Sequence, residues 1–264
     1  MDDNWICSAV KLVKILRCLI RRPLRKHAIF SFVNASIILP LCGCLQMSEH
    51  NAVPVATYDK VARSFLMLTR EDEKNGKTIW SQGSGVAVKS ETGRHFIYTA
   101  RHILFDKDND NATPARLYAT LMTGKSREID ISKFEIPRDN HDAVRIILEK
   151  PICDELLLSN RVPRFGERLS FFGDAAGAGV MNVELGTVVA IGPLEFEHTA
   201  DIVRGMSGGP VVDSKCNVIG LCEKGRKMTA HKNGKELKDE SKYLQIRKFG
   251  VLLSNIEWKR QIGD

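Results

Sequence analysis

The chain has 264 residues and a formal net charge of +7; 43% of its residues are hydrophobic and 27% are charged. This composition is ordinary for a globular protein, and the length is sufficient to bury a sizeable core. The first 44 residues carry seven lysines and arginines against two aspartates, so they hold +5 of the charge and leave +2 for the remainder. The main part of the chain therefore lacks the basic surface expected of a nucleic-acid-binding protein. It has no C-x-x-C or H-E-x-x-H pattern, so neither a metal site nor a cofactor is indicated.

Residues 1–44 are predicted to direct the chain to a membrane. A basic cluster at 21–27 precedes a mostly apolar stretch from Ala28 to Cys44, the order typical of segments that enter the translocon. The stretch ends in Leu41-Cys42-Gly43-Cys44, which resembles a bacterial lipobox and implies removal of residues 1–43 and lipidation of Cys44. We expect a lipid-anchored protein of the bacterial envelope, facing the periplasm or the exterior. An uncleaved anchor and a buried helix remain alternatives.

The next part of the chain, about 57–150, is predicted to form one β-barrel, with residues 45–56 as a tether before it. Short apolar runs separated by polar loops indicate its strands. The expected strands are Val61–Thr69, Gly85–Val88, His95–Thr99, Leu117–Met122 and Val144–Leu148. The acidic stretch from Asp106 to Asn111 looks like the start of a calcium loop but lacks the glycine at position six and the glutamate at position twelve. We interpret it as a solvated loop.

A second barrel is predicted over about 151–253. Its expected strands are Leu169–Gly173, Gly186–Ile191, Ile202–Val203, Val211–Asp213, Val218–Leu221 and Phe249–Leu253. The polar run between Cys222 and Tyr243 is interpreted as a solvent loop. Residues 253–262 are predicted to form a closing helix with Ser254 as its N-cap.

The run Gly205-Met206-Ser207-Gly208-Gly209-Pro210 places one hydroxyl between glycines on a turn that few other residues could adopt. Such a turn can aim the N–H groups of Gly205 and Ser207 at one point, which is the geometry of an oxyanion hole beside a nucleophilic serine. Met206 is a candidate third donor. The alternative is a glycine-rich hairpin with an incidental serine.

A base and an orienting carboxylate precede this serine. His102 follows the apolar run that ends at Thr99, and an imidazole is the natural base for a serine hydroxyl. Asp142 stands at the start of another apolar run, where a buried carboxylate could hold the imidazole in the required tautomer. Asp139 is the rival carboxylate, but it is set back from the strand.

Five motifs together carry a family resemblance. They are Gly83-Ser84-Gly85-Val86, Thr99-Ala100-Arg101-His102, Asp142-Ala143-Val144, Gly205–Pro210 and Val218-Ile219-Gly220-Leu221. In this order they resemble the trypsin-like serine peptidases of the chymotrypsin fold, in particular the compact HtrA-like branch. The resemblance covers roughly residues 55–260. It implies an all-β domain over 57–264, built of two packed six-stranded antiparallel barrels with a short C-terminal helix. Only 57 residues follow Ser207, too few for the PDZ domain that HtrA proteases usually carry.

The resemblance implies a serine endopeptidase that acts on protein or peptide substrates through His102, Asp142 and Ser207. Met206 stands where zymogens of the family carry an aspartate, so activation by a newly freed N-terminus is not expected. The implied substrate pocket involves Asp201, Leu221 and Cys222. An aspartate at position 201 would favour cleavage after lysine or arginine, whereas Cys222 replaces the histidine of relatives that cleave after glutamate. Two other functions stay open: a catalytically silent protease fold used as a binding module at the membrane, and a membrane-associated assembly protein.

Overall fold

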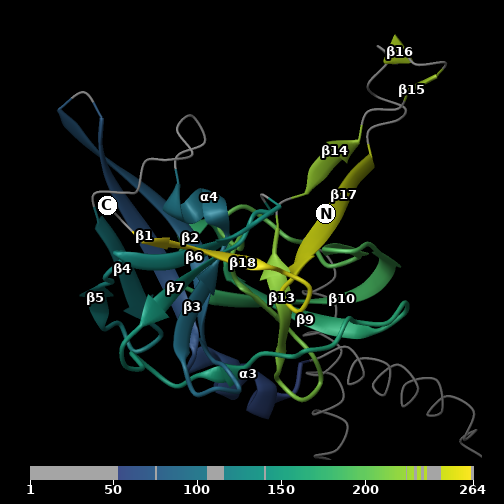
Figure 1. The fold of residues 1–264 in the computed structure, drawn as a ribbon. Helices are drawn as coiled ribbons and strands as arrows, with labels where there is room; N and C mark the ends of the chain where they lie inside the picture. Colours follow the sequence, from purple (N-terminus) through teal and green to yellow (C-terminus); the bar gives the residue numbers. More distant parts are fainter. Residues whose placement is uncertain are drawn as a thin grey trace, which may run out of the picture. The chain divides into compact units, whose positions relative to one another are not determined.

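A computed structural model describes residues 53–74, 76–105, 116–139, 141–223, 225–228, 231–232, 235–236 and 245–262 (Figure 1). Residues 50–264 form one compact unit, and all of the described residues belong to it. The predicted targeting segment with Cys44, most of the predicted tether and the acidic stretch at 106–111 lie outside the described residues. No helix within the described ranges is both long enough and apolar enough to cross a membrane.

The first sheet has nine strands. Eight of them follow the order β18-β6-β7-β3-β2-β1-β4-β5, whose two ends do not pair with each other, and β8 pairs in parallel with β2. Most of its strands come from the first half of the chain and occupy the left of Figure 1. Their bounds are β1 Phe65–Lys74, β2 Lys77–Lys89, β3 His95–Thr99, β4 Arg116–Leu121, β5 Ser126–Glu128, β6 Lys133–Pro137, β7 Val144–Leu148, β8 Leu156–Leu157 and β18 Trp258–Ile262. A short helix, α4 (Arg101–Leu104), follows β3.

The second sheet has seven strands in the order β11-β10-β9-β12-β13-β17-β14. Strand β11 also pairs with β17, so six of the strands close into a barrel and β14 extends beyond it. Their bounds are β9 Arg168–Asp174, β10 Met181–Ile191, β11 Glu195–His198, β12 Pro210–Val212, β13 Val218–Cys222, β14 Arg226–Met228 and β17 Gln245–Leu252. A 3₁₀ turn, η2 (Ala175–Gly177), follows β9, and a separate small ribbon pairs β15 (His231–Lys232) with β16 (Lys235–Glu236).

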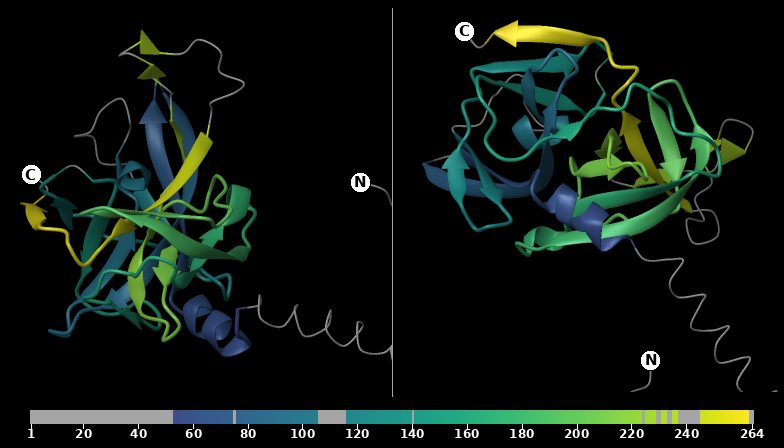
Figure 2. Two further views of the ribbon diagram at one scale, coloured as in Figure 1. Left: turned by 90° about the vertical axis from the view of Figure 1, so that its right-hand side faces the viewer. Right: turned by 90° about the horizontal axis from the view of Figure 1, so that it is seen from below.

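Three apolar cores hold this unit together. One lies inside the first sheet around Leu68 and Ile97, and one lies inside the second barrel around Phe171 and Ile219. The third is shared: Tyr98 and other side chains of the first sheet pack there with side chains of the second barrel. Figure 2 shows the two sheets side by side. Because apolar burial is the main stabilising term in folding, the shared core fixes the two sheets relative to each other.

Helix α3 (Val55–Ala62) packs beside both sheets. Val61 is fully buried in the shared core. The Tyr58 hydroxyl donates a hydrogen bond of 3.0 Å to the Met181 carbonyl of β10, and Arg63 pairs with Asp154 at 2.8 Å. Sequence reasoning placed a tether up to residue 56 and a strand from Val61, so α3 corrects both boundaries.

The predicted all-β fold is confirmed, and β3 and β7 have the predicted bounds. The predicted C-terminal helix over 253–262 is wrong, because residues 258–262 form strand β18, which pairs along all five positions of β6. Trp258 and Ile262 are four residues apart, a spacing that suits a helix face and equally one face of a strand. The strand is favoured because β6 would otherwise have an unpaired edge, and pairing with β18 satisfies the backbone N–H and C=O groups of that edge. Ser254 lies in a turn and caps no helix.

Two further expectations need correction. The first barrel is not a closed six-stranded one, since its nine strands follow an open path. Residues 202–203 form no strand, and the strand in this region is β11 instead. Its sequence Glu-Phe-Glu-His alternates acidic and buried side chains, which an apolar-run criterion overlooks.

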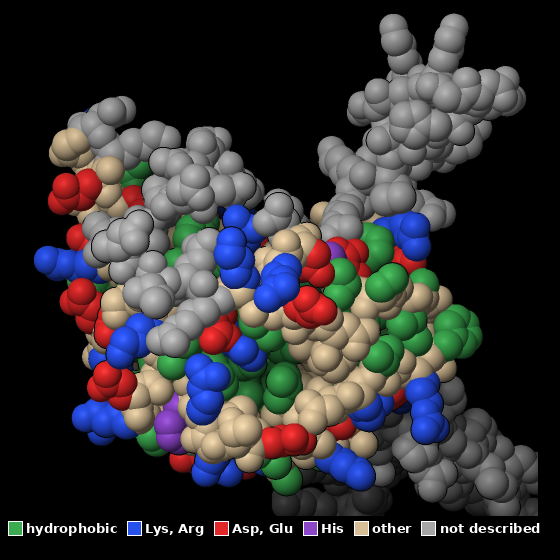
Figure 3. All heavy atoms as spheres, viewed as in Figure 1, with side chains coloured by type: hydrophobic (Ala, Val, Ile, Leu, Met, Phe, Trp, Pro, Cys, Tyr) green, Lys and Arg blue, Asp and Glu red, His purple; other side chains and the backbone are tan. Residues whose placement is uncertain are grey.

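Charged side chains of both signs alternate over the face shown in Figure 3, and neither sign forms a broad field there. This agrees with the near-neutral charge of the chain after residue 44. The described cysteines, Cys153, Cys216 and Cys222, are free thiols. Within the described ranges no cluster of three His, Cys, Asp or Glu side chains is arranged to hold a metal ion.

Candidate active site

His102 is positioned by the junction between β3 and α4. Strand β3 is buried along four of its five residues, and the chain turns at Ala100 into the short helix. The neighbouring side chains Ile103 and Leu104 are buried in the core of the first sheet. The imidazole of His102 therefore stands on a packed element while its side chain remains 21% exposed.

Asp142 contacts His102 through both carboxylate oxygens. Its Oδ2 lies 2.6 Å from His102 Nδ1, and its Oδ1 accepts a hydrogen bond of 2.9 Å from the His102 backbone N–H. The rival Asp139 instead pairs with Nδ1 of His141 at 3.0 Å. The two-point contact of Asp142 fixes both the ring and the backbone of His102, and it leaves Nε2 as the ring nitrogen available to a substrate or nucleophile.

Ser207 is buried to 7% exposure in the turn before β12. The turn needs glycine on both sides of the serine. Gly205 has φ +95° and approaches so closely that an added Cβ would lie 2.2 Å from the Asp174 carbonyl oxygen. Gly208 has φ +82°, and an added Cβ would lie 2.4 Å from the Ser84 carbonyl oxygen. Only glycine combines this backbone conformation with such close packing.

The carbonyl groups around the serine are each held by a hydrogen bond. Ala176 N–H donates to Arg204 O at 2.7 Å, the Ser84 hydroxyl donates to Gly205 O at 2.9 Å, and Gly209 N–H donates to Met206 O at 3.0 Å. The N–H groups of Gly205 and Ser207 donate to no acceptor within the described ranges. By contrast, Met206 N–H donates to Val203 O at 3.2 Å, so the expectation that Met206 supplies an additional oxyanion donor is not supported.

The serine turn is joined to the elements that carry His102. Ser84 N–H, on β2, donates to Ser207 O at 3.0 Å. Gly208 packs so closely on the end of β3 that its hypothetical Cβ would lie 2.4 Å from Thr99 Oγ1 and 2.6 Å from Ala100 N. The structure therefore brings the Ser207 turn against the residues that immediately precede His102.

Asp201 lies apart from these contacts. Its side chain is 79% exposed and its Oδ1 lies 2.5 Å from Lys248 Nζ. This ion pair lowers the pKa of the Asp201 carboxyl, mainly through the hydrogen bond from Lys248. No described contact joins Asp201 to the serine turn, so its predicted role in a substrate pocket gains no support.

Cys222 and Leu221, by contrast, adjoin the serine turn. Cys222 O accepts a hydrogen bond of 2.9 Å from Gly208 N–H, and Leu221 pairs with Pro210. Burial raises the pKa of the Cys222 thiol far above its ordinary value, so the thiol stays protonated near neutral pH and is not an alternative nucleophile.

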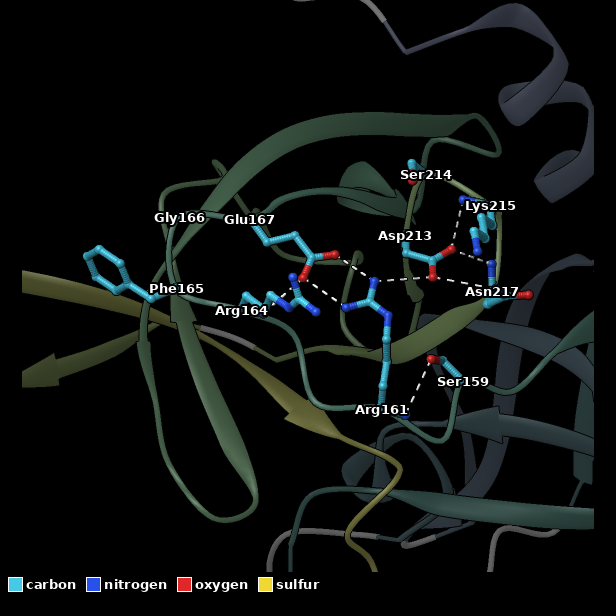
Figure 4. Close-up of a pocket in the computed structure, with 10 residues that line it drawn as sticks. All are labelled: Ser159, Arg161, Arg164, Phe165, Gly166, Glu167, Asp213, Ser214, Lys215 and Asn217. Carbon is cyan, nitrogen blue, oxygen red and sulfur yellow. Dashed lines mark hydrogen bonds and ion pairs between the residues drawn. The ribbon is translucent and has the colours of Figure 1, made fainter.

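A hollow of about 620 Å³ lies between the loop after β8 and the turn after β12 (Figure 4). The Arg161 guanidinium occupies its middle, where it pairs with Glu167 at 2.6 Å and with Asp213 at 3.2 Å. Phe165 points away from this charged cluster. None of His102, Asp142 and Ser207 lines the hollow, and its central charges are already paired.

Sequence reasoning did not assign a role to Ser84 or to Asp174. Ser84 is completely buried, and its hydroxyl connects Gly205 O with Asp174 N–H. The carboxylate of Asp174 in turn accepts a hydrogen bond from Gly179 N–H at 3.0 Å. The Gly-Ser-Gly motif marked the neighbourhood of Ser84, but nothing in the sequence indicated that its hydroxyl reaches a turn 121 residues away.

Comparison with known families agrees with this geometry. Residues 83–221, more than half of the chain, match the trypsin-like peptidase domain. No curated protein matches the chain significantly. The matched range includes β2 and β3, Asp142, the Ser207 turn and β13. The chain therefore belongs to the trypsin-like peptidase domain family, a family of serine peptidases with the chymotrypsin-like all-β fold.

Proposed function

We propose that the protein is a serine endopeptidase in which Ser207 is the nucleophile, His102 the general base and Asp142 the group that orients His102. The observation that carries this proposal is the two-point contact of the Asp142 carboxylate with His102 Nδ1 and with the His102 backbone N–H. That contact leaves one imidazole nitrogen to act as a base, on an element that packs against the serine turn.

In the proposed acylation step, His102 Nε2 takes the hydroxyl proton of Ser207 as Oγ attacks the carbonyl carbon of a peptide bond. The C–N bond then breaks, and the imidazolium returns its proton to the leaving amine. Asp142 stabilises the imidazolium while it exists. In the second step, His102 removes a proton from a water molecule as the water oxygen attacks the acyl carbon. The bond between the acyl carbon and Ser207 Oγ then breaks, and the imidazolium returns the proton to Oγ.

Each step passes through an oxyanion, and the proposed donors to it are the N–H groups of Gly205 and Ser207. Two observations support this assignment: neither N–H has an acceptor within the described ranges, and the neighbouring carbonyls are held in hydrogen bonds. The removal of one such donor from an oxyanion hole reduces kcat by roughly 10²–10³. Gly205 and Ser207 are therefore proposed to contribute through their backbone N–H groups, in addition to the nucleophilic hydroxyl of Ser207.

The test is the variant Ser207→Ala, with Ser81→Ala as a control at an exposed serine of β2. We expect the wild type and the control to hydrolyse a mixed peptide library and to react covalently with a fluorophosphonate probe. Ser207→Ala should retain its fold and lose both activities. Full hydrolysis by Ser207→Ala would overturn the assignment of the nucleophile. A wild type that neither hydrolyses nor reacts would instead favour a catalytically silent binding module.

We further propose that the peptidase is an HtrA-like protein tethered to the bacterial envelope through a lipid on Cys44. Support comes from the Leu41–Cys44 motif and the basic and apolar residues before it. Labelling of the full chain with a fatty-acid analogue in a bacterial host tests this. Cys44→Ala should abolish labelling and Cys42→Ala should retain it. Labelling that persists in Cys44→Ala would exclude lipidation at this position.

A further inference from the structure

Ser84 is a buried serine with a complete set of hydrogen bonds. Its side chain is 0% exposed. The hydroxyl donates to Gly205 O at 2.9 Å and accepts from Asp174 N–H at 2.8 Å. Its backbone N–H donates to Ser207 O at 3.0 Å, and its carbonyl accepts from the Thr99 hydroxyl at 2.7 Å. One residue of the first sheet therefore contacts the serine turn at two carbonyls.

The hydroxyl of Ser84 holds the peptide group that lies between the two proposed oxyanion donors. The Gly205–Met206 peptide separates the N–H of Gly205 from that of Ser207, and its orientation sets the angle between them. Peptide groups are planar, and the described part of the chain has no cis bonds. Holding Gly205 O therefore also fixes the Met206 N–H, and with it the plane that lies between the two donor N–H groups. The flanking carbonyls of Arg204 and Met206 are held by backbone donors, whereas Gly205 O is held by the Ser84 side chain.

We propose that Ser84 is a positioning residue for the oxyanion hole: its hydroxyl holds the Gly205–Met206 peptide so that the N–H groups of Gly205 and Ser207 converge. This inference rests on the proposed serine peptidase function. Ser84 itself touches neither the substrate nor the reacting atoms. The backbone of Ser84 also binds Ser207 O, so the first sheet, which carries His102, sets the position of both the nucleophile and the oxyanion donors.

The proposed position of the Ser84 hydroxyl predicts which kinetic constant a substitution should change. Oxyanion donors stabilise charge that develops in the transition state, so their misplacement lowers kcat and changes substrate binding little. A serine that shaped only the substrate pocket would raise KM instead. A serine that only stabilised the fold would lower the apparent kcat through the folded fraction, and strands β3 and β7 would then exchange their amide hydrogens faster. The kcat and KM values, taken together with the protection of β3 and β7, therefore separate a positioning role from a packing role.

The test compares Ser84→Ala and Ser84→Cys with the control Ser64→Ala. The cysteine variant keeps nearly the volume of serine but replaces a strong donor with a weak one. Ser64 is equally buried, at 1% exposure, and its hydroxyl has no hydrogen-bond partner. We expect kcat to fall about 10- to 100-fold in both Ser84 variants, in the range of a weakened oxyanion donor, with KM within twofold of wild type. Affinity for a peptide trifluoromethyl ketone should fall in parallel, and Ser64→Ala should match the wild type in both.

Hydrogen exchange measured by mass spectrometry gives a readout that does not depend on activity. The segment 203–209 should exchange faster in both Ser84 variants, while strands β3 and β7 should remain as protected as in the wild type. Wild-type kcat and wild-type exchange in Ser84→Cys would overturn the positioning role and leave the peptidase function standing. An unreactive wild type would overturn both proposals, because the role of Ser84 rests on that function.

Discussion

In the first sheet, His102 and Asp142 are held by side-chain contacts between two packed elements, whereas in the second barrel Ser207 is held by the main chain of its own turn. The carboxylate of Asp142 spans the ring and backbone of His102. The turn around Ser207 relies instead on glycines with positive φ and on hydrogen-bonded carbonyls. The two halves of the candidate site therefore differ in what a substitution can disturb.

Each half of the candidate site is therefore vulnerable to a different kind of substitution. A side-chain contact can be removed by one isosteric substitution that leaves the backbone in place. A main-chain arrangement is disturbed by an added methyl group, since a Cβ forces the backbone or its neighbours to move.

Among substitutions that leave the nucleophile in place, Asp142→Asn should have the largest effect. The amide keeps the shape of the side chain but no longer holds the His102 tautomer that leaves Nε2 free as a base, so kcat should fall by roughly 10³–10⁴. Steady-state hydrolysis of a peptide substrate measures this. Asp139→Asn is the matched control, because Asp139 contacts His141 instead. An equal loss in both variants would contradict the assignment of Asp142.

The next effect is expected for Gly205→Ala, with Gly124→Ala as control. Both glycines have positive φ, +95° and +80°, so alanine strains the backbone at either site. Only at Gly205 would the new Cβ meet backbone, 2.2 Å from Asp174 O; at Gly124 no atom lies within 4 Å. We expect kcat to fall by roughly 10²–10³ in Gly205→Ala, as for a lost oxyanion donor, and to stay unchanged in Gly124→Ala. Similar activity in the two variants would show that the turn tolerates displacement.

A third prediction concerns the stability of the protein at acid pH, and it depends on one histidine of the second barrel. His198 is buried against Phe171, with ring centroids 4.1 Å apart, and burial lowers the pKa of its imidazole from 6.5 to about 4. Between these values the unfolded chain binds the proton and the folded protein does not. The free energy of unfolding should therefore fall as the pH falls from 6.5 to about 4, by up to about 3 kcal/mol.

Urea unfolding at several pH values tests this with the variant His198→Leu, which should lose much less stability over the same pH range. His95→Gln is the control, since His95 is 22% exposed and pairs with Glu155, and it should keep the acid sensitivity of the wild type. An undiminished pH dependence in His198→Leu would assign the effect to other groups.

The smallest effect is expected for Asp201→Asn. Because the Asp201 carboxylate is exposed and paired with Lys248, its removal should alter the ratio of kcat/KM for lysine and leucine at the cleavage site by less than twofold. Digestion of a peptide library by the variant and the wild type provides the measurement. A strong loss of preference for basic residues would restore Asp201 to the substrate pocket.

The sequence was sufficient to predict those features that local pattern determines. Strands β3 and β7 are short apolar runs, and the residues that follow or precede them are His102 and Asp142. Strand β18 was misread because its spacing suits a helix equally well, and the partner that selects a strand, β6, lies more than a hundred residues earlier. The role of Ser84 was hidden for the same reason: its partners Gly205 and Asp174 are adjacent only after the two sheets have packed.

The pairing of β18 with β6 has a consequence for biosynthesis. As a nascent chain leaves the ribosome, the elements bearing His102, Asp142 and Ser207 all emerge before Trp258. Until β18 arrives, β6 is an unpaired edge, and β6 adjoins the strand that follows Asp142. The sheet that carries the acid–base pair is thus completed last, so a chain whose synthesis stops early presents an unfinished sheet and an exposed strand edge.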